Sequence, residues 1–376
     1  MEHDITAVVE HFDLGGEIVA SAPVTTGHIN DTYVLTTSAR GRQTRYVLQR
    51  INHHVFKDPP RLMENVARIT EHIRTKVAKT DPERASRQLM VIPSDGAHGC
   101  HRDADGNFWR VYNFVENAVT YDTPESTGLA CEAARMFGWF QSLLTDLPGP
   151  ILHETIPGFH DTPHRLRYFQ HILAEDRFNR AQGAAAEIDF VVENAALCNV
   201  LPDLVARGEL PIRIAHNDTK INNVMLDKDT GQGVCVIDLD TVMPGLSVHD
   251  FGDLVRTAAC RAAEDERDLA KVAIDIPLFE ALARGFARET GRFLTPAEKC
   301  HLVFGGKLIT FEQMIRFLTD DLAGDVYYKI HRDGHNLDRA RTQMKLVQSI
   351  IAQEETLNGL VARAFQDSPG GMNGKE

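Results

Sequence analysis

Residues 212–240 constrain the fold of this chain more than any other stretch. Two short apolar runs, residues 224–226 and 234–237, flank the polar segment 228–233, which contains two glycines. Short apolar runs on either side of a glycine-containing turn are typical of a β-hairpin. The sequence therefore predicts a two-stranded ribbon at this point.

Polar residues come before the first strand of this ribbon and after its second strand. Asp218 lies five residues before Asn223, which directly precedes the first strand, and Asp238 follows the second strand. We expect the hairpin to bring these three side chains to one end. In phosphoryl transfer an aspartate accepts or orients the proton of the attacking hydroxyl, while asparagine and aspartate oxygens hold the magnesium ion that bridges the nucleotide phosphates. The pattern predicts Asp218 as the base and Asn223 and Asp238 as the magnesium ligands.

The order His-x-Asp-x4-Asn, followed fifteen residues later by an apolar strand ending in Asp, resembles the catalytic loop of the aminoglycoside phosphotransferase and protein-kinase-like superfamily. The resemblance implies an α+β, bilobal fold, with a small N-terminal antiparallel sheet lobe before a larger, mainly helical C-terminal lobe. It implies ATP as co-substrate and Mg2+ as cofactor. The alternative is a set of ordinary turn residues, because Asp and Asn crowd loops. A plain hairpin, however, has no need of the complete set.

Three further residues near this loop have expected roles. His216 is interpreted as structural, fixing the loop that carries Asp218. Asp250 begins an Asp-Phe-Gly triplet twenty-seven residues after Asn223, too far along to close the same hairpin. It resembles instead the acidic element that supports the catalytic loop in small-molecule kinases. Asp240 is either an auxiliary metal ligand or the cap of the next turn.

Length, charge and cysteine usage bound the class of protein. A chain of 376 residues exceeds what one core usually serves, so we expect a nucleotide-binding lobe at 1–117, a catalytic and sugar-binding lobe at 118–367, and a flexible tail at 368–376. The net charge of −13 argues against sequence-independent nucleic-acid binding. Six scattered cysteines favour reduced thiols, and the lack of a leader or long apolar run favours a cytoplasmic protein away from membranes. The oligomeric state stays open, with a monomer favoured.

The N-terminal lobe is predicted from alternating and helical patterns. A short helix is expected within residues 4–14, and a longer one after Pro60. The expected strands are 16–25, 33–36, 45–51, 89–92 and 108–115.

The turn at residues 26–32 occupies the place where a kinase folds a hairpin over the nucleotide phosphates. Kinase loops there are rich in glycine, but this turn has a single one. Backbone amides and side chains near Asn30 and Thr32 are expected to contact the phosphates. An ordinary polar hairpin turn is the open alternative.

The third strand carries Gln49 where the superfamily usually has a lysine that pairs with the α and β phosphates. Alternation places Val47 on the same face as Gln49, and both are expected to line the nucleotide site. Since glutamine carries no charge, either the site dispenses with that cation, or Arg50 or another basic residue supplies it.

The strand at 108–115 leads, by the same resemblance, into a hinge whose backbone hydrogen-bonds adenine. Phe114, Val115 and Glu116 are the expected adenine contacts. Trp109 and Tyr112 are interpreted as core residues rather than stacking partners.

The C-terminal lobe shows helical spacing from Ser126 onward and at residues 278–289, 297–317 and 339–364. His160 and His164 lie four apart, a metal-binding spacing if helical. Pro163 lies between them and makes a continuous helix doubtful, so this segment is interpreted as a loop near the substrate.

Six longer stretches share the pattern of one family: residues 27–33, 161–164, 215–223, 237–245, 314–318 and 324–327. They resemble the bacterial N-acetylhexosamine 1-kinases, over nearly the whole chain. That family transfers the γ-phosphoryl group of ATP to the anomeric hydroxyl of GlcNAc or GalNAc and has a glutamine-containing third strand. The resemblance implies that Asp218 faces the sugar O1, while His28, Arg316 and Tyr327 hold the hydroxyls and the N-acetyl group.

Other interpretations remain open at this point. Arg316 and Tyr327 can also be read as a helix-surface charge and a core aromatic. A kinase of aminoglycosides, choline or another small alcohol is the alternative enzyme, and a nucleotide-binding pseudokinase is the alternative outside catalysis, because the strand lysine is missing. The sequence does not distinguish GlcNAc from GalNAc.

Overall fold

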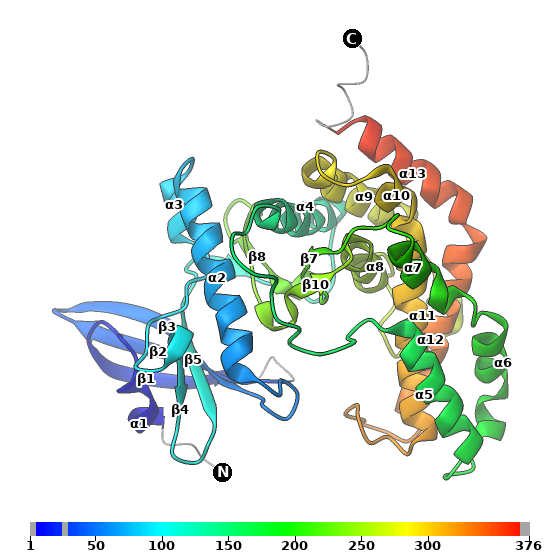
Figure 1. Cartoon of the computed structure of the whole chain (residues 1–376), viewed down its shortest axis with the longest axis horizontal. Coiled ribbons are helices and arrows are strands. Elements are labelled where there is room, and N and C mark those ends of the chain that lie inside the picture. Colours follow the sequence, from blue (N-terminus) through cyan, green and yellow to red (C-terminus); the bar gives the residue numbers. More distant parts are fainter. Residues whose placement is uncertain (1–4, 25–28, 369–376) are drawn as a thin grey trace. The chain divides into compact units, whose positions relative to one another are not determined.

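The computed structural model describes residues 5–24 and 29–368 and divides into two compact units. The first, which we call the sheet unit, comprises Met1–Val119, Leu143–Pro157 and Met225–Pro244. The second, the helical unit, comprises Thr120–Ser142, Gly158–Val224 and Gly245–Glu376. Figure 1 shows the elements of both units.

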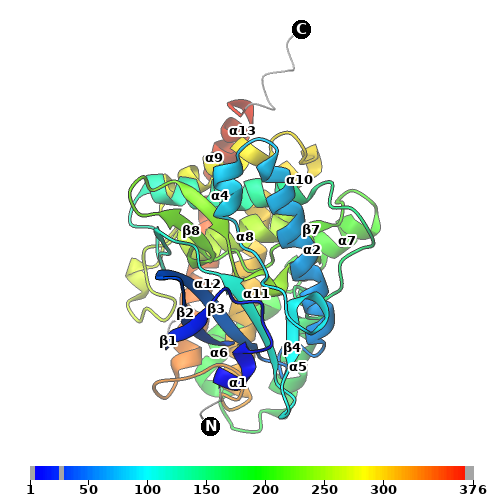
Figure 2. The ribbon, with the colours of Figure 1, turned by 90° about the vertical axis from the view of Figure 1, so that its left-hand side faces the viewer.

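The sheet unit is built on a five-stranded antiparallel sheet with the order β1-β2-β3-β5-β4. One face of the sheet lies against the short helix α1 (Figure 2). There Val8 and Val9 meet Leu35, Leu48 and Trp109 in a buried cluster. The core position expected for Trp109 is therefore confirmed. The strands are β1 Glu17–Val24, β2 Asp31–Ala39, β3 Arg42–Ile51, β4 Cys100–Arg102 and β5 Phe108–Asn113, and α1 is Ile5–Val9.

Two expectations for this sheet were wrong in detail. Asp31 and Thr32 belong to β2 rather than to the preceding turn. Residues 89–92 form no regular strand, because Val91 makes only an isolated bridge to Tyr112. Pro93 follows this segment and has no N–H to extend a ladder, and β4 takes the edge position instead.

Helix α2, Pro59–Ala78, begins where the sequence predicts a helix. The Asp58 side chain accepts a hydrogen bond from the Arg61 N–H, and proline occupies the first turn, a common helix start. The short helix α3, Pro82–Ser86, follows.

The predicted hairpin is confirmed as β8 Val224–Asp227 and β9 Gly233–Val236, which join β6 Ala118–Val119 in a three-stranded sheet. The turn is stabilised by Asp227, whose carboxylate accepts from the N–H groups of Asp229 and Thr230. These hydrogen bonds, with Arg87 beside the carboxylate, lower the pKa of Asp227 to about 2.

The helical unit is centred on α11, Leu302–Leu322, which packs along α5, α8 and α12. Its contact with α8 is unusually close, because a Cβ on Gly252 would lie 2.5 Å from the Gly305 carbonyl oxygen. The helices are α4 Thr127–Leu144, α5 Thr162–Glu175, α6 Ala185–Glu193, α7 Leu197–Ala206, α8 Ser247–Ala258, α9 Ile276–Thr290, α10 Pro296–Cys300, α12 His335–Ala352 and α13 Glu354–Gln366, and the two short strands are β7 Arg213–Ala215 and β10 Met243–Gly245.

Two helices expected to be continuous are each divided. The pattern at 297–317 splits into α10 and α11 at His301, and that at 339–364 into α12 and α13 at Gln353. Both break residues have φ below −100°, while apolar spacing continues past them. The α+β class, with a sheet first and helices after it, is confirmed.

Candidate active site

Asp218 lies in the loop between β7 and β8, within the helical unit. Its carboxylate Oδ2 is 3.1 Å from Lys220 Nζ and accepts from Asn223 Nδ2 at 3.3 Å. Asn223 Nδ2 also donates to the Asp218 carbonyl oxygen at 2.8 Å. The two sequence-predicted residues of this loop are therefore in direct contact, and a lysine that the sequence reasoning did not single out stands beside them.

Asp250, near the start of α8, fixes the loop that carries Asp218 through hydrogen bonds. Its carboxylate accepts from the backbone N–H of His216 at 2.9 Å and of Asn217 at 2.7 Å, and it also accepts from Gln141. Thr219 donates its hydroxyl to the Asp250 carbonyl oxygen at 2.6 Å. Burial raises the pKa of Asp250, and the hydrogen bonds counter that effect. Asp250 thus supports the loop that carries Asp218, as expected.

His216 is fully buried, and its ring meets Phe137 and Phe140 edge-on at 5.3 and 5.7 Å between centroids. This packing fits the structural role expected for it. Asn217, the next residue, has a left-handed backbone with φ of 64°, and its side chain lies against Gly245, where a Cβ would be 2.6 Å from Asn217 Oδ1. The backbone on both sides of Asp218 is therefore fixed by burial and by close contact.

His160 makes a second connection to the loop. Its Nε2 lies 3.1 Å from the Asn217 carbonyl oxygen, and its Nδ1 lies 3.0 Å from Glu312 Oε1. Thr162 donates its hydroxyl to Glu312 Oε2 at 2.5 Å. A carbonyl and an ionised carboxylate can only accept hydrogen bonds, so both ring nitrogens carry protons and His160 is an imidazolium.

Electrostatics support this assignment. Burial acts against the charge of His160, but the Glu312 carboxylate outweighs it and raises the pKa of His160. Burial likewise acts against an ionised Glu312, but His160 and the nearby hydrogen bonds lower its pKa to about 2. The His249 ring lies beside that of His160, with centroids 4.9 Å apart and planes inclined by 57°. Burial first, then the neighbouring His160, lowers the pKa of His249 to about 3.

The His160 and His164 pair does not form a metal site. His160 has both nitrogens engaged, while the backbone N–H of His164 donates to Asp161 at the start of α5. The expectation of a loop is wrong for His164, because α5 begins at Thr162 and Pro163 occupies its first turn, where proline is tolerated; only His160 lies before the helix.

Arg316 lies on α11 one turn after Glu312. Its guanidinium donates to Gln313 Oε1 at 3.0 Å and lies 5.7 Å from the ring centroid of Tyr328. Burial opposes its charge, but Tyr328 and Glu312 raise the pKa of Arg316. Tyr327 is 70 % exposed and packs edge-on against Tyr328, so it is not a core aromatic.

The segment that carries Tyr327 is fixed by Asp320. The carboxylate of Asp320 accepts from the backbone N–H groups of Val326, Tyr327 and Tyr328 at 2.8 to 3.0 Å. Arg316 and Tyr327 therefore belong to one region of the helical unit, which we call the acceptor corner. Glu312 and His160 connect this corner to the loop of Asp218.

In the sheet unit, Gln49 is part of a buried polar network with Arg110 and Asp240. Gln49 Oε1 accepts from Arg110 Nε at 3.0 Å and Nη2 at 2.8 Å, because the two residues are directly opposite on β3 and β5. Arg110 forms a bidentate ion pair with Asp240, and Asn30 Nδ2 donates to Asp240 Oδ2 at 2.8 Å. The side chains of Arg110 and Asp240 are 1 % and 2 % exposed.

Two arginines of this sheet lie near Gln49, and both are paired with an aspartate. Burial acts against the charge of Arg110, but Asp240 raises the pKa of Arg110. The Arg50 guanidinium pairs with Asp31 at the end of β2. The Asp240 carboxylate accepts from Arg110 and Asn30 rather than capping the next turn. Its role as an auxiliary metal ligand stays a prediction.

The other residues expected near the nucleotide are placed by the register of the sheet. Gln49 Nε2 donates to Thr32 Oγ1 at 3.1 Å, directly across β2 and β3. Val47 lies on the same face of β3 as Gln49, opposite Tyr112 of β5. Tyr112 is buried, as expected for a core residue. His28 lies outside the described residues.

The expected hinge follows β5. The Phe114 N–H donates to the Arg45 carbonyl oxygen at 3.2 Å, and the Arg45 guanidinium lies 3.9 Å over the Phe114 ring while pairing with Glu116. Val115 is buried. The Phe114 N–H is therefore already used within the sheet.

Asp238 follows β9 in the sheet unit and has a left-handed backbone, with φ and ψ both 58°. Aspartate tolerates this conformation better than most residues, and it occurs often at functional positions. Asp238 lies near enough to Arg110 to contribute to the raised pKa of that guanidinium.

The comparisons with known proteins fit this geometry. A five-stranded antiparallel sheet, then helices, and a His-x-Asp-x4-Asn loop held by a buried acid define a protein-kinase-like phosphotransferase fold. Within that class, the chain belongs to the phosphotransferase enzyme family, whose family model matches residues 21–289.

Solved structures of low sequence identity share the fold. An aminoglycoside phosphotransferase from Alicyclobacillus acidocaldarius is 17 % identical, with a TM-score of 0.55 over 97 % of this chain and 96 % of that one. A spectinomycin phosphotransferase in complex with ADP and spectinomycin is 13 % identical, with a TM-score of 0.53 over 93 % and 97 %. A choline kinase from Cryptosporidium parvum is 12 % identical, with a TM-score of 0.51 over 96 % and 99 %.

Within the described ranges, no helix has the length and apolar character needed to cross a membrane.

Proposed function

We propose that this phosphotransferase uses ATP and magnesium to phosphorylate the anomeric hydroxyl of an N-acetylhexosamine, giving the sugar 1-phosphate. The observation that carries the proposal is the path of contacts from Asp218, through Asn217, His160 and Glu312, to the helix that bears Arg316. It connects a base to a group suited to hold a neutral acceptor.

Asp218 acts as the base in this proposal. Its carboxylate accepts the proton of the acceptor hydroxyl while that oxygen forms a bond to the γ-phosphorus and the bond to the β-phosphate oxygen breaks, releasing ADP. Lys220 Nζ lies 3.1 Å from this carboxylate. Asn223 and the buried hydrogen bonds of Asp250 keep it in place.

The nucleotide is assigned to the sheet unit. Asn30, Thr32, Val47 and Gln49 would line the phosphate and base region, and Phe114, Val115 and Glu116 the adenine region. Arg110 supplies the fixed positive charge that the strand lysine provides elsewhere, because it is charged, buried and bonded to Gln49.

Magnesium would be held by Asn223 and Asp238. Asn223 uses its amide nitrogen on the Asp218 carbonyl, which leaves its oxygen as the metal-facing atom, and a carboxylate with an amide oxygen is a donor set that magnesium accepts. The ion, when bound, neutralises charge on the transferred phosphate.

The charge of the acceptor corner favours a neutral sugar over a cationic antibiotic or choline. Arg316 carries a positive charge there, and two nearby acids have cationic partners: Glu312 pairs with His160, and Asp253 pairs with Arg256. An arginine fork and the exposed Tyr327 offer directional contacts to hydroxyl and N-acetyl groups. His28 is proposed as a further sugar contact on the resemblance alone.

The proposal is tested by incubating the purified protein with ATP, magnesium and a panel of GlcNAc, GalNAc, other hexoses, kanamycin and choline. ADP release shows turnover, and phosphorus NMR distinguishes an anomeric phosphate from other esters. Turnover with kanamycin or choline but not with any hexosamine would overturn the sugar assignment. ATP binding without turnover on any acceptor would overturn catalysis and leave a nucleotide-binding pseudokinase.

A further inference from the structure

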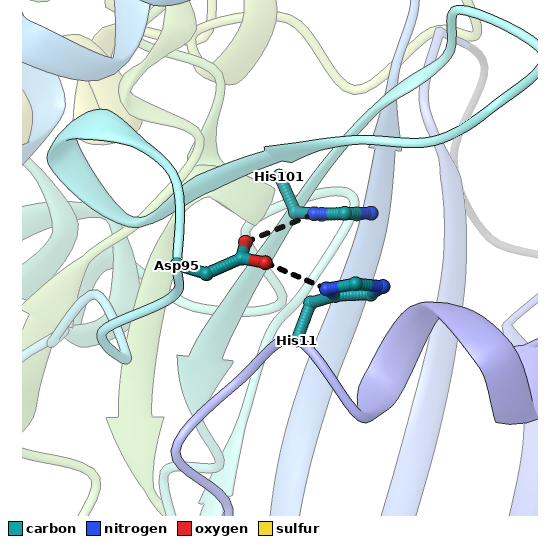
Figure 3. Close-up of side chains that lie close together, drawn as sticks. All are labelled: His11, Asp95 and His101. Carbon is teal, nitrogen blue, oxygen red and sulfur yellow. Dashed lines mark hydrogen bonds and ion pairs between the residues drawn. The ribbon is translucent and has the colours of Figure 1, made fainter.

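Among the described residues, His11, Asp95 and His101 form a compact group on the sheet unit (Figure 3). Asp95 Oδ2 lies 2.6 Å from His11 Nδ1, and Asp95 Oδ1 lies 3.0 Å from His101 Nδ1. One oxygen or nitrogen from each residue falls within a 4.8 Å span. Two imidazoles and one carboxylate are a ligand set found in zinc sites.

The backbone brings the three side chains together without help from a ligand. Asp95 donates its N–H to the His11 carbonyl oxygen at 3.1 Å, and Phe12 makes a β-bridge to Ser94. His101 belongs to β4, where it pairs with Trp109. Three separate chain segments are thus fixed to one another around the group.

The short loop from Asp95 to His101 depends on Gly96. A Cβ there would lie 1.8 Å from the Cys100 carbonyl oxygen, so only glycine allows the chain to turn back this tightly. The turn is what places the Asp95 carboxylate next to the His101 ring.

We propose that His11, Asp95 and His101 bind a divalent transition-metal ion of the zinc type, with water completing its coordination. Imidazole nitrogen favours such ions over magnesium or calcium, which prefer oxygen ligands. Ligand atoms around a tetrahedral ion with bonds of about 2.1 Å lie about 3.4 Å apart, so both Nδ1 atoms must move slightly away from the Asp95 oxygens that they now contact at 2.6 and 3.0 Å.

Binding requires one adjustment of the side chains. The two rings are stacked, with centroids 3.7 Å apart and planes inclined by 11°, so at least one must tilt for both lone pairs to converge on an ion. The His11 side chain is 43 % exposed and has room to tilt, while His101 is 12 % exposed. Both imidazoles carry the remaining proton on Nε2 when the metal takes Nδ1.

The ion would fasten the N-terminal helix to the sheet. His11 follows α1, whose Val8 and Val9 pack on the sheet core. Asp95 and His101 belong to the loop before β4 and to β4 itself, so the ion would link α1 to the edge of the sheet. This role does not involve the proposed kinase reaction.

The test is zinc titration of the full chain by calorimetry, in buffer with excess magnesium and with Cys300, an exposed thiol, replaced by serine. The wild-type group should bind one equivalent of zinc, and His101→Asn should weaken that binding at least about tenfold. His98→Asn is the matched control, because it removes an exposed imidazole three residues away, outside the group.

A thermal melt gives the second readout. Zinc should raise the Tm of the parent and of His98→Asn, and leave that of His101→Asn unchanged. Equal zinc affinity in the parent and His101→Asn, or the absence of a saturable equivalent in the parent, would show that the three side chains form an ion pair only.

Discussion

The Oδ1 atom of Asp250 lies 2.7 Å from the backbone nitrogen of Asn217, the residue directly before Asp218. Its Oδ2 atom accepts from His216 in the same way. One buried carboxylate on α8 therefore sets the path of the chain into the proposed base.

Asp250→Asn should lower both stability and turnover. The amide nitrogen would face backbone N–H groups that need an acceptor, and each buried group left without one costs about 1–3 kcal/mol. We expect a lower free energy of unfolding in urea and a kcat reduced at least about tenfold, with ATP affinity preserved in calorimetry. Unchanged kcat in a correctly folded variant would contradict a positioning role for Asp250.

Asp218→Asn should reduce kcat by about 100 to 10,000-fold, the usual contribution of a positioned base. ATP affinity should change little, since the nucleotide is assigned to other residues. Asp122→Asn is the control, because Asp122 is an exposed acid that bonds Asn222 of the same loop. If both variants lose the same activity, Asp218 is not the base.

Arg110→Met should destabilise the sheet unit by about 3–5 kcal/mol, because it leaves Asp240 buried without its partner. The double variant Arg110→Met/Asp240→Leu removes both charges and should recover most of that loss. If the Arg110 cation stabilises the nucleotide phosphates, both variants should bind ATP more weakly than the parent chain. Recovery of ATP affinity in the double variant would show that Arg110 has a purely structural role.

The His160 and Glu312 ion pair should make stability depend on pH. The folded pKa of His160 is raised, so its contribution is complete below the unfolded value of about 6.5 and is lost as the pH rises through the raised value. The folded pKa of Glu312 is lowered to about 2, so its contribution is present above about 4.5 and is lost as the pH falls toward 2.

His160→Gln should abolish the alkaline loss while lowering stability at pH 6. The glutamine amide can still donate one hydrogen bond, but it carries no charge to match Glu312. Urea unfolding from pH 5 to 9, with parallel kcat measurements, checks this. If the loss of stability at alkaline pH is as large in His160→Gln as in the parent, that loss arises from a group other than His160.

Arg316→Ala should raise the KM for the sugar about tenfold or more, as expected for loss of a charged hydrogen bond of about 1.5–3 kcal/mol. Arg316→Lys keeps the charge but loses the planar fork, so it should recover only part of that affinity. An effect confined to ATP would overturn the assignment of Arg316 to the acceptor.

Local patterns were enough to predict much of the fold. The hairpin at β8 and β9 and the start of α2 follow from turn residues, apolar runs and the Asp58 cap. Local patterns did not predict which segment forms the edge strand. Residues 89–92 and 100–102 can both pair with β5, and only the three-dimensional structure shows that residues 100–102 do so.

The same distinction holds for the candidate site: pairs of residues close in sequence were predicted, and pairs distant in sequence were not. Asp218 and Asn223 are close in sequence and were predicted together. Arg110 and Asp240 are 130 residues apart, and no local pattern pairs them. The available signal was a lone arginine inside the otherwise apolar and aromatic run of β5, which a buried ion pair explains. His160 and Glu312, separated by 152 residues, gave no such signal.

The pairing of Gln49 with Arg110 has a consequence for how such chains change over evolutionary time. A single exchange of Gln49 for lysine would set two positive charges side by side in a space already filled by a guanidinium. Positions 49 and 110 should therefore vary together among related chains, and a search that requires the strand lysine will pass over chains of this kind.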